Sequence, residues 1–419
     1  MSIPLLSIIL LTHSFVAEET LRSVHAFFRH GDRYPTEDLN IIPGQLDNII
    51  LGALTDAGHL RLAGIGEKFR KDAYTKLSET YEFDEATFYA TTTDRVEQSA
   101  HAFAAGLYKE KGPKKYPENT TCIFANCHQP VPVTSVLKDN EYFMRGNERC
   151  PTAAKIGVQT TKTDAYQKKL APYKSIIELL DKELKRGLSS NPADISQTID
   201  CLLTYKENGI AIPESINAKW DEIMKLFDLT SLIWSPFDNK LFCNASLGVF
   251  YRRIVSEMKE DLARKTPDNR PTLHAYFAHG TSLQIILGCL GYDLTIHPRY
   301  AGMVVIELWS DGTNDRLVFK LDLAPEKDGT HTLAAWTPTF CKTPADCTIK
   351  GFSSGYESVI ESETLTQWFY ETCGLQTIEN NLPLLIVNIV LGACLAVAIL
   401  VCVLVIIRTM RQSKKPQVV

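Results

Sequence analysis

The sequence predicts an α/β fold that is interrupted by a helical insertion and followed by one membrane-spanning helix. Three observations support this prediction. Strand-like runs alternate with helical patterns in two separate stretches, the region between them contains helical patterns with little strand signal, and a long uncharged run lies near the C-terminus. The composition, 45% hydrophobic and 22% charged with a net charge of −5, excludes a disordered chain, a collagen-like chain and a strongly basic nucleic-acid binder.

An apolar run, IPLLSIILL, occupies residues 3–11. It gives way to small and polar residues near Ala17, as a cleaved signal peptide does, although Phe15 fits poorly three positions before a cut after Ala17. We therefore predict a signal peptide at residues 1–17. The alternative is that the first strand of the core begins here.

The first strand and helix alternation covers residues 18–108. The β-prone run RSVHAFF ends abruptly in the charged sequence RHGDRYP, as a buried strand does when it leads into a functional loop. A helical pattern follows, with Thr55 or Asp56 as its N-cap. FYATTT then predicts the end of a second strand, and an alanine-rich helix follows it.

The composition changes over residues 109–250. A charged segment with proline and glycine, KEKGPKKYPENTT, is followed by helical patterns such as SIIELLDKELKR, which predicts a mostly helical cap. The alternation resumes over residues 251–381, with the strand PTLHAYFA, the loop HGT, the helix SLQIILGCLG and strands near MVVIELW and RLVFKLDL.

Residues 384–407 form a run of 24 without a charged side chain. As a helix this run spans roughly 36 Å, which exceeds a hydrocarbon core of about 30 Å. We predict a transmembrane helix at residues 382–407, with a buried core helix as the alternative. The cytoplasmic tail, residues 408–419, carries four basic and no acidic residues, which places it in the cytosol. The protein is then a type I membrane protein whose ectodomain carries −9 and lies outside the cell or in an acidic lumen.

Nine of the eleven cysteines lie in the predicted ectodomain, which fits an oxidising compartment. The odd number leaves one unpaired, and Cys289, in an apolar helical pattern, is our candidate for a buried free thiol. Cys122 with Cys127 and Cys341 with Cys347 are close enough to close local loops, although the sequence alone does not fix the pairing.

Two sequons begin at Asn119 and Asn244. In an extracellular setting each is an acceptor for N-glycosylation, and both should then lie on exposed loops. The chain contains neither a CxxC pair nor an HExxH motif, so we predict no metal site and no cofactor.

The most informative motif is RHGDRYP, which begins at Arg29. A neutral imidazole at His30 suits nucleophilic attack on phosphorus, and the guanidinium groups of Arg29 and Arg33 suit the binding of phosphoryl oxygens. A solvated charged loop is the alternative for this motif alone. A second histidine, His279, also follows a strand and opens a helix whose N-terminal amides can help to hold an anion.

Together these motifs resemble the histidine acid phosphatase family, whose signature is RHGxRxP early in the chain and a His-Asp pair late. LTDAGHLRLAGIG and HQPVPVTSV are similar to further family segments, so the resemblance covers essentially the whole ectodomain. The resemblance implies a doubly wound α/β core with a mostly helical cap. It also implies a phosphohistidine intermediate on His30, phosphate binding by Arg29 and Arg33, and a pocket completed by His279.

Two positions depart from the family pattern. Gly280 stands where the family has the aspartate that protonates the leaving oxygen, and loss of a general acid typically costs about 10²- to 10⁴-fold. Tyr89 aligns with a pocket arginine of the family. Three nearby carboxylates are weaker candidates for the missing acid: Asp32, Asp94 and Glu97.

The resemblance also implies disulfide pairs. Cys150 would pair with Cys373, and Cys341 with Cys347. The usual partner of Cys201 is absent, so Cys201 would pair instead with Cys243.

We therefore expect a membrane-anchored acid phosphatase that cleaves phosphomonoesters and is weakened by Gly280. The alternative is a catalytically inactive ectodomain of the same fold that binds a phosphorylated or other anionic ligand. The expected ligand is in both cases a small anion, nucleic acid is excluded, and a homodimer is an open alternative for the assembly.

Overall fold

A computed structural model describes residues 18–41, 44–109, 131–188, 191–232, 236–265, 269–362, 365–374 and 378–413. The predicted signal peptide, Asn119, Cys122 and Cys127 lie outside the described residues, and so do most residues of the charged segment near 110–130. The chain divides into two units, residues 1–362 and 363–419, which are described separately.

The described part of the first unit contains one mixed sheet of seven strands, in the order β3-β2-β4-β1-β5-β6-β7. The pairs β2–β3, β2–β4 and β1–β4 are parallel, and β1–β5, β5–β6 and β6–β7 are antiparallel. The strand bounds are β1 Thr20–Arg29, β2 Ala86–Thr91, β3 Thr134–Val136, β4 Thr272–Ala278, β5 Met303–Ser310, β6 Asp315–Asp322 and β7 Ala334–Trp336.

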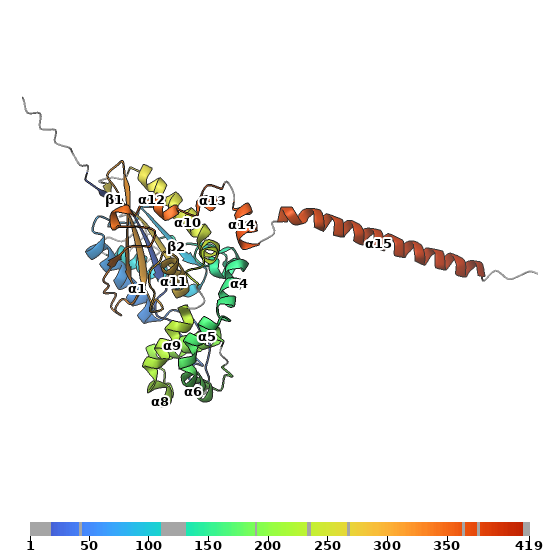
Figure 1. Cartoon of the computed structure of the whole chain (residues 1–419), viewed down its shortest axis with the longest axis horizontal. Coiled ribbons are helices and arrows are strands. Elements are labelled where there is room, and N and C mark those ends of the chain that lie inside the picture. The colour runs from blue at the N-terminus through green and yellow to red at the C-terminus, as the bar shows by residue number, and fades with distance from the viewer. Residues whose placement is uncertain are drawn as a thin grey trace, which may run out of the picture. The chain divides into compact units, whose positions relative to one another are not determined.

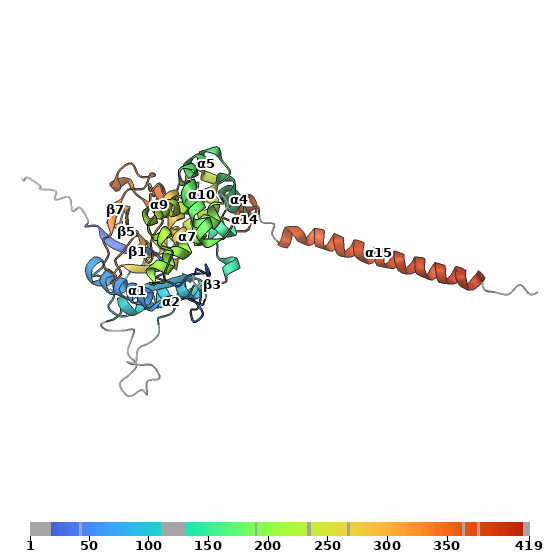
Figure 2. The same cartoon turned by 90° about the horizontal axis from the view of Figure 1, so that it is seen from below.

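Helices cover both faces of this sheet. On one face, Phe28 of β1 packs against Phe69 and Phe103, which belong to the helical layer of α1 (Asp56–Lys68), the π-helical turn η1 (Phe69–Ala73) and α2 (Asp94–Leu107). On the other face, Phe27 packs against Phe250 of α10 (Lys240–Ala263). Figure 2 shows α1 and α2 together on one side of the strands, with α9 and α10 on the other. The expected α/β core is therefore present, with an antiparallel half in its sheet.

Two glycines allow α1 and α2 to cross with their backbones in close contact. A Cβ atom on Gly106 would lie 1.8 Å from the carbonyl oxygen of Ala63, and one on Gly66 would lie 2.1 Å from that of Phe103. No side chain larger than hydrogen fits at either position. This close crossing holds α1, and the loop packed against its N-terminus, near the end of β1. Thr55 caps α1 as expected, by accepting a hydrogen bond from the Gly58 amide.

The described segments between residues 137 and 265 contain helices and no strand. They form a second hydrophobic core, which includes Leu39 and Leu46 from the loop after β1. In Figure 1, α5, α6, α8 and α9 gather at one end of the unit, away from the sheet. The bounds are η3 Lys138–Asn140, α3 Gly146–Arg149, α4 Pro151–Thr160, α5 Asp164–Leu170, η4 Ala171–Tyr173, α6 Lys174–Leu184, α7 Pro192–Glu207, α8 Glu214–Asn217 and α9 Trp220–Leu232, followed by α10.

The rest of the first unit contains α11 (Gly280–Cys289), β5 to β7, η6 (Pro344–Asp346), α12 (Ile349–Ser353) and α13 (Glu357–Ile360). The second unit contains α14 (Thr366–Cys373) and α15 (Ile378–Ser413). The predicted span at 382–407 falls within α15. Among the helices of the described residues, none is long and apolar enough to cross a membrane.

The disulfides correct two predictions. Cys243 of α10 is bonded to Cys289 of α11, so Cys289 is not a free thiol and Cys201 does not pair with Cys243. Cys201 is free and buried in α7. The pairing follows from helix packing, because α10 and α11 contact each other.

Two other cysteine predictions are not contradicted by the structure. The Cys341–Cys347 bond is confirmed. Cys150 and Cys373 are each disulfide-bonded, and their pairing with each other stays a prediction.

The expectation of a loop at Asn244 is wrong, since this residue is half-buried inside α10.

Candidate active site

Two parallel neighbouring strands bring the two predicted histidines together. Arg29 at the end of β1 stands in register with Ala278 at the end of β4. His30 and His279 follow directly, and their ring centroids lie 5.6 Å apart. The carboxyl ends of parallel strands are where α/β sheets usually bind ligands. The site therefore joins segments from opposite ends of the predicted core.

The backbone fixes which ring nitrogen of His30 is available for chemistry. Nδ1 of His30 lies 2.8 Å from the carbonyl oxygen of Gly31, which can only accept a hydrogen bond, so Nδ1 carries the proton. The lone pair is then on Nε2. Burial disfavours the charged ring, and Arg95 and Arg29 add like charge, so the pKa of His30 lies well below its ordinary value. His30 is a neutral imidazole, as a nucleophile must be.

Gly31 holds the loop of His30 against helix α1. A Cβ atom on Gly31 would lie 2.7 Å from the carbonyl oxygen of Gly58, and one on Gly58 would lie 2.3 Å from that of Asp32. The two backbones pack without side chains between them, which explains the glycine in the RHG motif. The Gly31 amide also donates to the Ser99 hydroxyl at 3.1 Å.

Arg29 and Arg33 are buried beside His30. Arg29 donates to the carbonyl oxygen of Pro298 at 2.6 Å, and its guanidinium carbon lies 4.4 Å from the centroid of the Tyr300 ring. Burial lowers the pKa of Arg29. Burial opposes the charge of Arg33, but the adjacent Asp200 together with Tyr300 and Cys201 outweighs burial and raises the pKa of Arg33.

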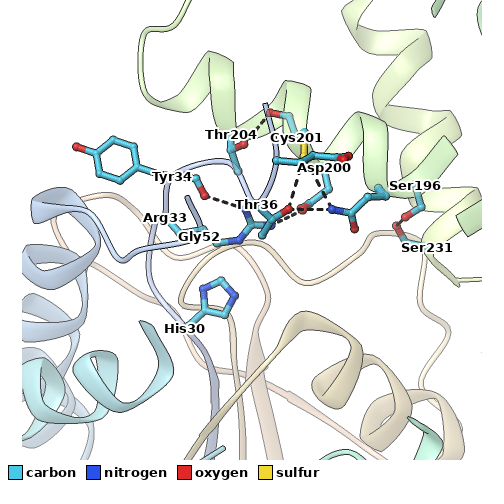
Figure 3. A network of polar contacts seen from close by, with 12 residues as sticks. His30, Arg33, Tyr34, Thr36, Gly52, Ser196, Asp200, Cys201, Thr204 and Ser231 are labelled. Carbon is cyan, nitrogen blue, oxygen red and sulfur yellow. Dashed lines mark hydrogen bonds and ion pairs between the residues drawn. The ribbon is translucent and has the colours of Figure 1, made fainter. Parts of the chain in front are cut away.

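Helix α7 contributes Asp200, a residue that the sequence analysis did not identify. Its carboxylate forms an ion pair with Arg33 and lies 3.8 Å from Nη2 of Arg29. Figure 3 shows Asp200 and Cys201 of α7 above the loop that carries Arg33, with His30 on the opposite side of that loop. In the free protein a carboxylate therefore partly occupies the position where these arginines would hold a phosphoryl group.

The alignment of Tyr89 with a pocket arginine of the family stays a prediction. The Tyr89 hydroxyl donates to Glu141, and its ring packs against Phe143, outside the residues that line the cavity. A further arginine that lines the cavity is Arg95, in the first turn of α2. Burial and the neighbouring Arg33 lower the pKa of Arg95 to about 10, which leaves it charged at neutral and acidic pH. A sequence signal was available, because Arg95 follows a Thr-rich turn at the start of a helix.

His279 and Gly280 form the other side of the site. Nε2 of His279 lies 3.2 Å from the Thr91 hydroxyl, and burial together with Arg95 and Arg145 lowers the pKa of His279 well below its ordinary value. Gly280 is the first residue of α11, and a Cβ atom on it would lie 2.3 Å from Nε2 of His297. His297 is a second residue that the sequence analysis did not identify, since no local motif marks it.

These residues line one cavity of about 680 Å³. Five cationic and two acidic side chains contribute to its wall: Arg29, Arg33, Arg95, Lys138, Arg145, Glu148 and Asp200. Arg145 pairs with Glu148, and Arg33 with Asp200. The excess of positive charge suits an anion. Asp32, Asp94 and Glu97 are not among the lining residues, and Asp32 pairs with Arg61 at 3.0 Å.

A possible metal-binding group lies elsewhere in the described residues. The ligand atoms of His25, Asp261 and His274 lie within 4.8 Å of one another. His274 already contacts Asp261 at 3.0 Å and the Thr87 hydroxyl at 2.9 Å. Hydrogen bonding within the core accounts for this cluster, and it is not part of the cavity. That the protein needs no metal stays a prediction.

Comparisons with known proteins agree with this geometry. Residues 20–321 match the family model described as histidine phosphatase superfamily (branch 2). Human prostatic acid phosphatase is 27% identical over 310 residues, covering 71% of this chain and 76% of that protein. Human lysosomal acid phosphatase is 22% identical over 400 residues, covering 94% and 89%.

Among solved structures, a Hafnia alvei phytase in complex with tartrate is similar, with a TM-score of 0.59 at 15% identity over 82% of this chain and 97% of that one. The same phytase in complex with myo-inositol hexakis sulphate gives a TM-score of 0.57 at 14% identity, with the same coverage of both chains. At these identities the likeness concerns the fold.

Proposed function

Because this chain belongs to branch 2 of the histidine phosphatase superfamily, we propose that it hydrolyses phosphomonoesters through a phosphohistidine intermediate on His30. The observation that carries the proposal is the neutral His30, whose Nδ1 proton is held by Gly31 while Nε2 keeps its lone pair. Nε2 attacks phosphorus, the P–N bond forms, and the bond from phosphorus to the leaving oxygen breaks. Water then attacks phosphorus, and the electron pair of the P–N bond returns to Nε2.

Arg29, Arg33 and Arg95 stabilise the phosphoryl charge in both steps. Fixed cations in a buried site stabilise a phosphoryl transition state more strongly than they would in water. When a phosphoryl group binds, it either displaces Asp200 from Arg33 or contacts the Arg33 guanidinium together with Asp200. The cationic wall favours phosphomonoesters over neutral ligands.

Gly280 itself offers no carboxyl group to protonate the leaving oxygen, so this proton has to come from another group. Substrates with stable leaving groups, such as aryl phosphates, need this proton least. We therefore expect aryl phosphates to be better substrates than alkyl phosphates.

We further propose that the enzyme works on the outer or lumenal side of a membrane as a type I protein. The uncharged run at 384–407 and the basic residues after it support the anchor. The Cys243–Cys289 and Cys341–Cys347 bonds support an oxidising compartment. A lysosomal acid phosphatase among the relatives supports an acidic lumen.

The test is turnover of an aryl phosphate at about pH 5, where a phosphomonoester is mainly a monoanion because its second pKa is about 6. Wild-type protein should release phosphate, and His30→Ala should not. His101→Asn changes an exposed histidine of α2 and serves as the matched control, which should keep full activity.

Absence of His30-dependent turnover would contradict the proposed activity. The buried arginines would then be evidence for the second candidate, a protein that binds anions without cleaving them. In that case inorganic phosphate should still bind to the wild type.

A further inference from the structure

His297 occupies the space next to Gly280 where a larger residue would place its side chain. A Cβ atom on Gly280 would lie 2.3 Å from Nε2, 2.8 Å from Cε1 and 3.3 Å from Cδ2 of His297. Real Cβ contacts are not this short, so a side chain at position 280 and the present position of the His297 ring exclude each other. The missing carboxyl group of Gly280 therefore coincides with an imidazole that reaches in from another segment.

Hydrogen bonds determine which nitrogen of His297 faces this space. Gln284 of α11 donates through Nε2 to the carbonyl oxygen of Ser231 at 2.9 Å, which turns its Oε1 toward Nδ1 of His297 at 3.0 Å. Oε1 can only accept, so Nδ1 carries the proton and Nε2 carries the lone pair. Within the described part of the chain, Nε2 has no hydrogen-bond partner, and His297 lines the catalytic cavity.

The surroundings keep this imidazole neutral and fixed in the free protein. His297 is 7% exposed, and its ring meets Phe227 edge-on at 5.4 Å between centroids. Its backbone amide donates to Asp228 at 2.9 Å, and Asp228 in turn pairs with Arg299 at 3.1 Å. Burial, together with the like charges of Arg29 and Arg299, lowers the pKa of His297 well below its ordinary value.

We propose that His297 carries out the proton transfers that a carboxyl group at position 280 would otherwise perform, with Nε2 as the atom that accepts and donates the proton. This inference rests on the proposed function and deepens it. It assigns the role of the absent acid to a residue on the segment before β5.

The proton balance closes if the substrate is the monoanion. Its acidic proton passes to Nε2 of His297, and the imidazolium passes it to the leaving oxygen as the P–O bond breaks and the P–N bond to His30 forms. The alcohol leaves. Water then attacks phosphorus and gives a proton to Nε2 of His297 while the P–N bond breaks. That proton departs with phosphate as its monoanion, and both histidines are again neutral.

This scheme predicts a pH profile. Activity depends on a substrate that brings its own proton, so kcat/KM should fall as the pH rises through about 6, the second pKa of a phosphomonoester. At lower pH the protonated form of His297 is short-lived. Once the negatively charged substrate has left the cavity, the positive charges of Arg29 and Arg299 disfavour this protonated form.

The test compares His297→Asn with wild type on an aryl and an alkyl phosphate. The asparagine amide can retain the hydrogen bond to Gln284, but it lacks a group at the position of Nε2 and cannot titrate. Alkyl phosphate turnover should fall by about 10²- to 10⁴-fold, as expected for loss of a general acid and base. With the aryl phosphate, the first step survives and the second is slow, so a burst of one equivalent of phenol per site should precede slow turnover.

A second pair of variants guards against a change in folding. Gly280→Asp alone should lose activity, because its Cβ atom collides with His297. Gly280→Asp combined with His297→Ala provides both the carboxyl group and the space for it, and should recover alkyl phosphate turnover relative to His297→Ala. His101→Asn again serves as the control.

The outcomes separate this inference from the proposed function. Suppose that the wild type shows His30-dependent turnover. If His297→Asn then lowers the turnover of the aryl and the alkyl phosphate equally and without a burst, or changes neither, His297 is not the proton carrier. The proposed phosphatase activity would still stand. If wild type shows no His30-dependent turnover, both proposals fail.

Discussion

At the scale of single residues, the charge of the site comes from side chains that the structure brings to one cavity from separate elements. Arg29 and Arg33 flank the nucleophile in sequence, whereas Arg95 reaches it from α2. After burial, Arg95 is the strongest cause that lowers the pKa of both His30 and His279. It therefore has two effects, since it attracts the phosphoryl group and also keeps the nucleophile unprotonated.

Replacing Arg95 tests its part in anion binding. In a His30→Ala background, which prevents covalent chemistry, Arg95→Ala should weaken binding of inorganic phosphate by about 10- to 100-fold, because a hydrogen bond to a charged group contributes about 1.5–3 kcal/mol. Isothermal titration calorimetry gives the dissociation constant. Tyr89→Phe in the same background is the control and should bind as the background does. The reverse pattern would restore Tyr89 as the pocket residue.

At the scale of elements, helix packing decides which cysteines meet. The Cys243–Cys289 bond ties α10, which covers one face of the sheet, to α11, which follows directly after His279. The bond closes a loop with a sequence separation of 46. It thus limits the movement of the helix that begins at Gly280.

Removing this bond should destabilise the protein. Cys243→Ser combined with Cys289→Ser is expected to lower the free energy of unfolding by about 2–4 kcal/mol, as loss of a disulfide typically does. Urea denaturation measures the change. Cys201→Ser is the matched control, because Cys201 is free and its neighbours Thr36 and Gln197 can hydrogen-bond a hydroxyl. A peptide map that joins Cys201 to Cys243 would contradict this assignment.

At the scale of the whole molecule, a group of buried titrating residues joins the sheet to α10. His25 of β1 stacks on His274 of β4 at 4.6 Å between ring centroids. Asp261 of α10 lies 3.8 Å from the His25 ring and 3.0 Å from the His274 ring, and Glu257 of α10 lies 3.7 Å from the His25 ring. Arg253 pairs with Glu257. Burial first, and then His274, lower the pKa of His25 to about 3. This core is therefore sensitive to acid, in a protein proposed to work in an acidic compartment.

The predicted loss of stability at low pH can be tested by measuring the free energy of unfolding at several pH values. In the unfolded chain His25 binds a proton below about pH 6.5, whereas the folded state resists protonation down to about pH 3, so stability should fall as the pH falls through that window. The lowered pKa values of Asp261 and Glu257 act in the same direction. His25→Phe keeps an aromatic ring at this position and should flatten the slope between these pH values, whereas His101→Phe should not. An unchanged slope in His25→Phe would count against this account.

The sequence was informative where the signal is local. The apolar run before RHGDRYP and the strand before His279 indicated the two strand ends that meet at the site, because hydrophobic runs that stop abruptly are readable without tertiary information. Local patterns marked Arg95 at the start of a helix, but they could not show that it lines the cavity, because its direction depends on how the turn before α2 folds. They could not identify His297 either, because its role follows from its position beside Gly280 in the folded chain. Nor could they pair Cys243 with Cys289, because the packing of α10 against α11 sets the distance between these residues.

The position of β1 in the sheet has a consequence for biosynthesis. Its two neighbours, β4 and β5, lie more than 240 residues further along the chain. At about 5–20 residues per second, the ribosome needs roughly 12–50 s to make the intervening segment. During this time the buried run around Phe27 and Phe28 has neither strand partner, and an unpaired hydrophobic strand invites aggregation. We expect the nascent chain to depend on chaperones until β4 emerges, and a chain truncated before Thr272 to be unable to assemble the site.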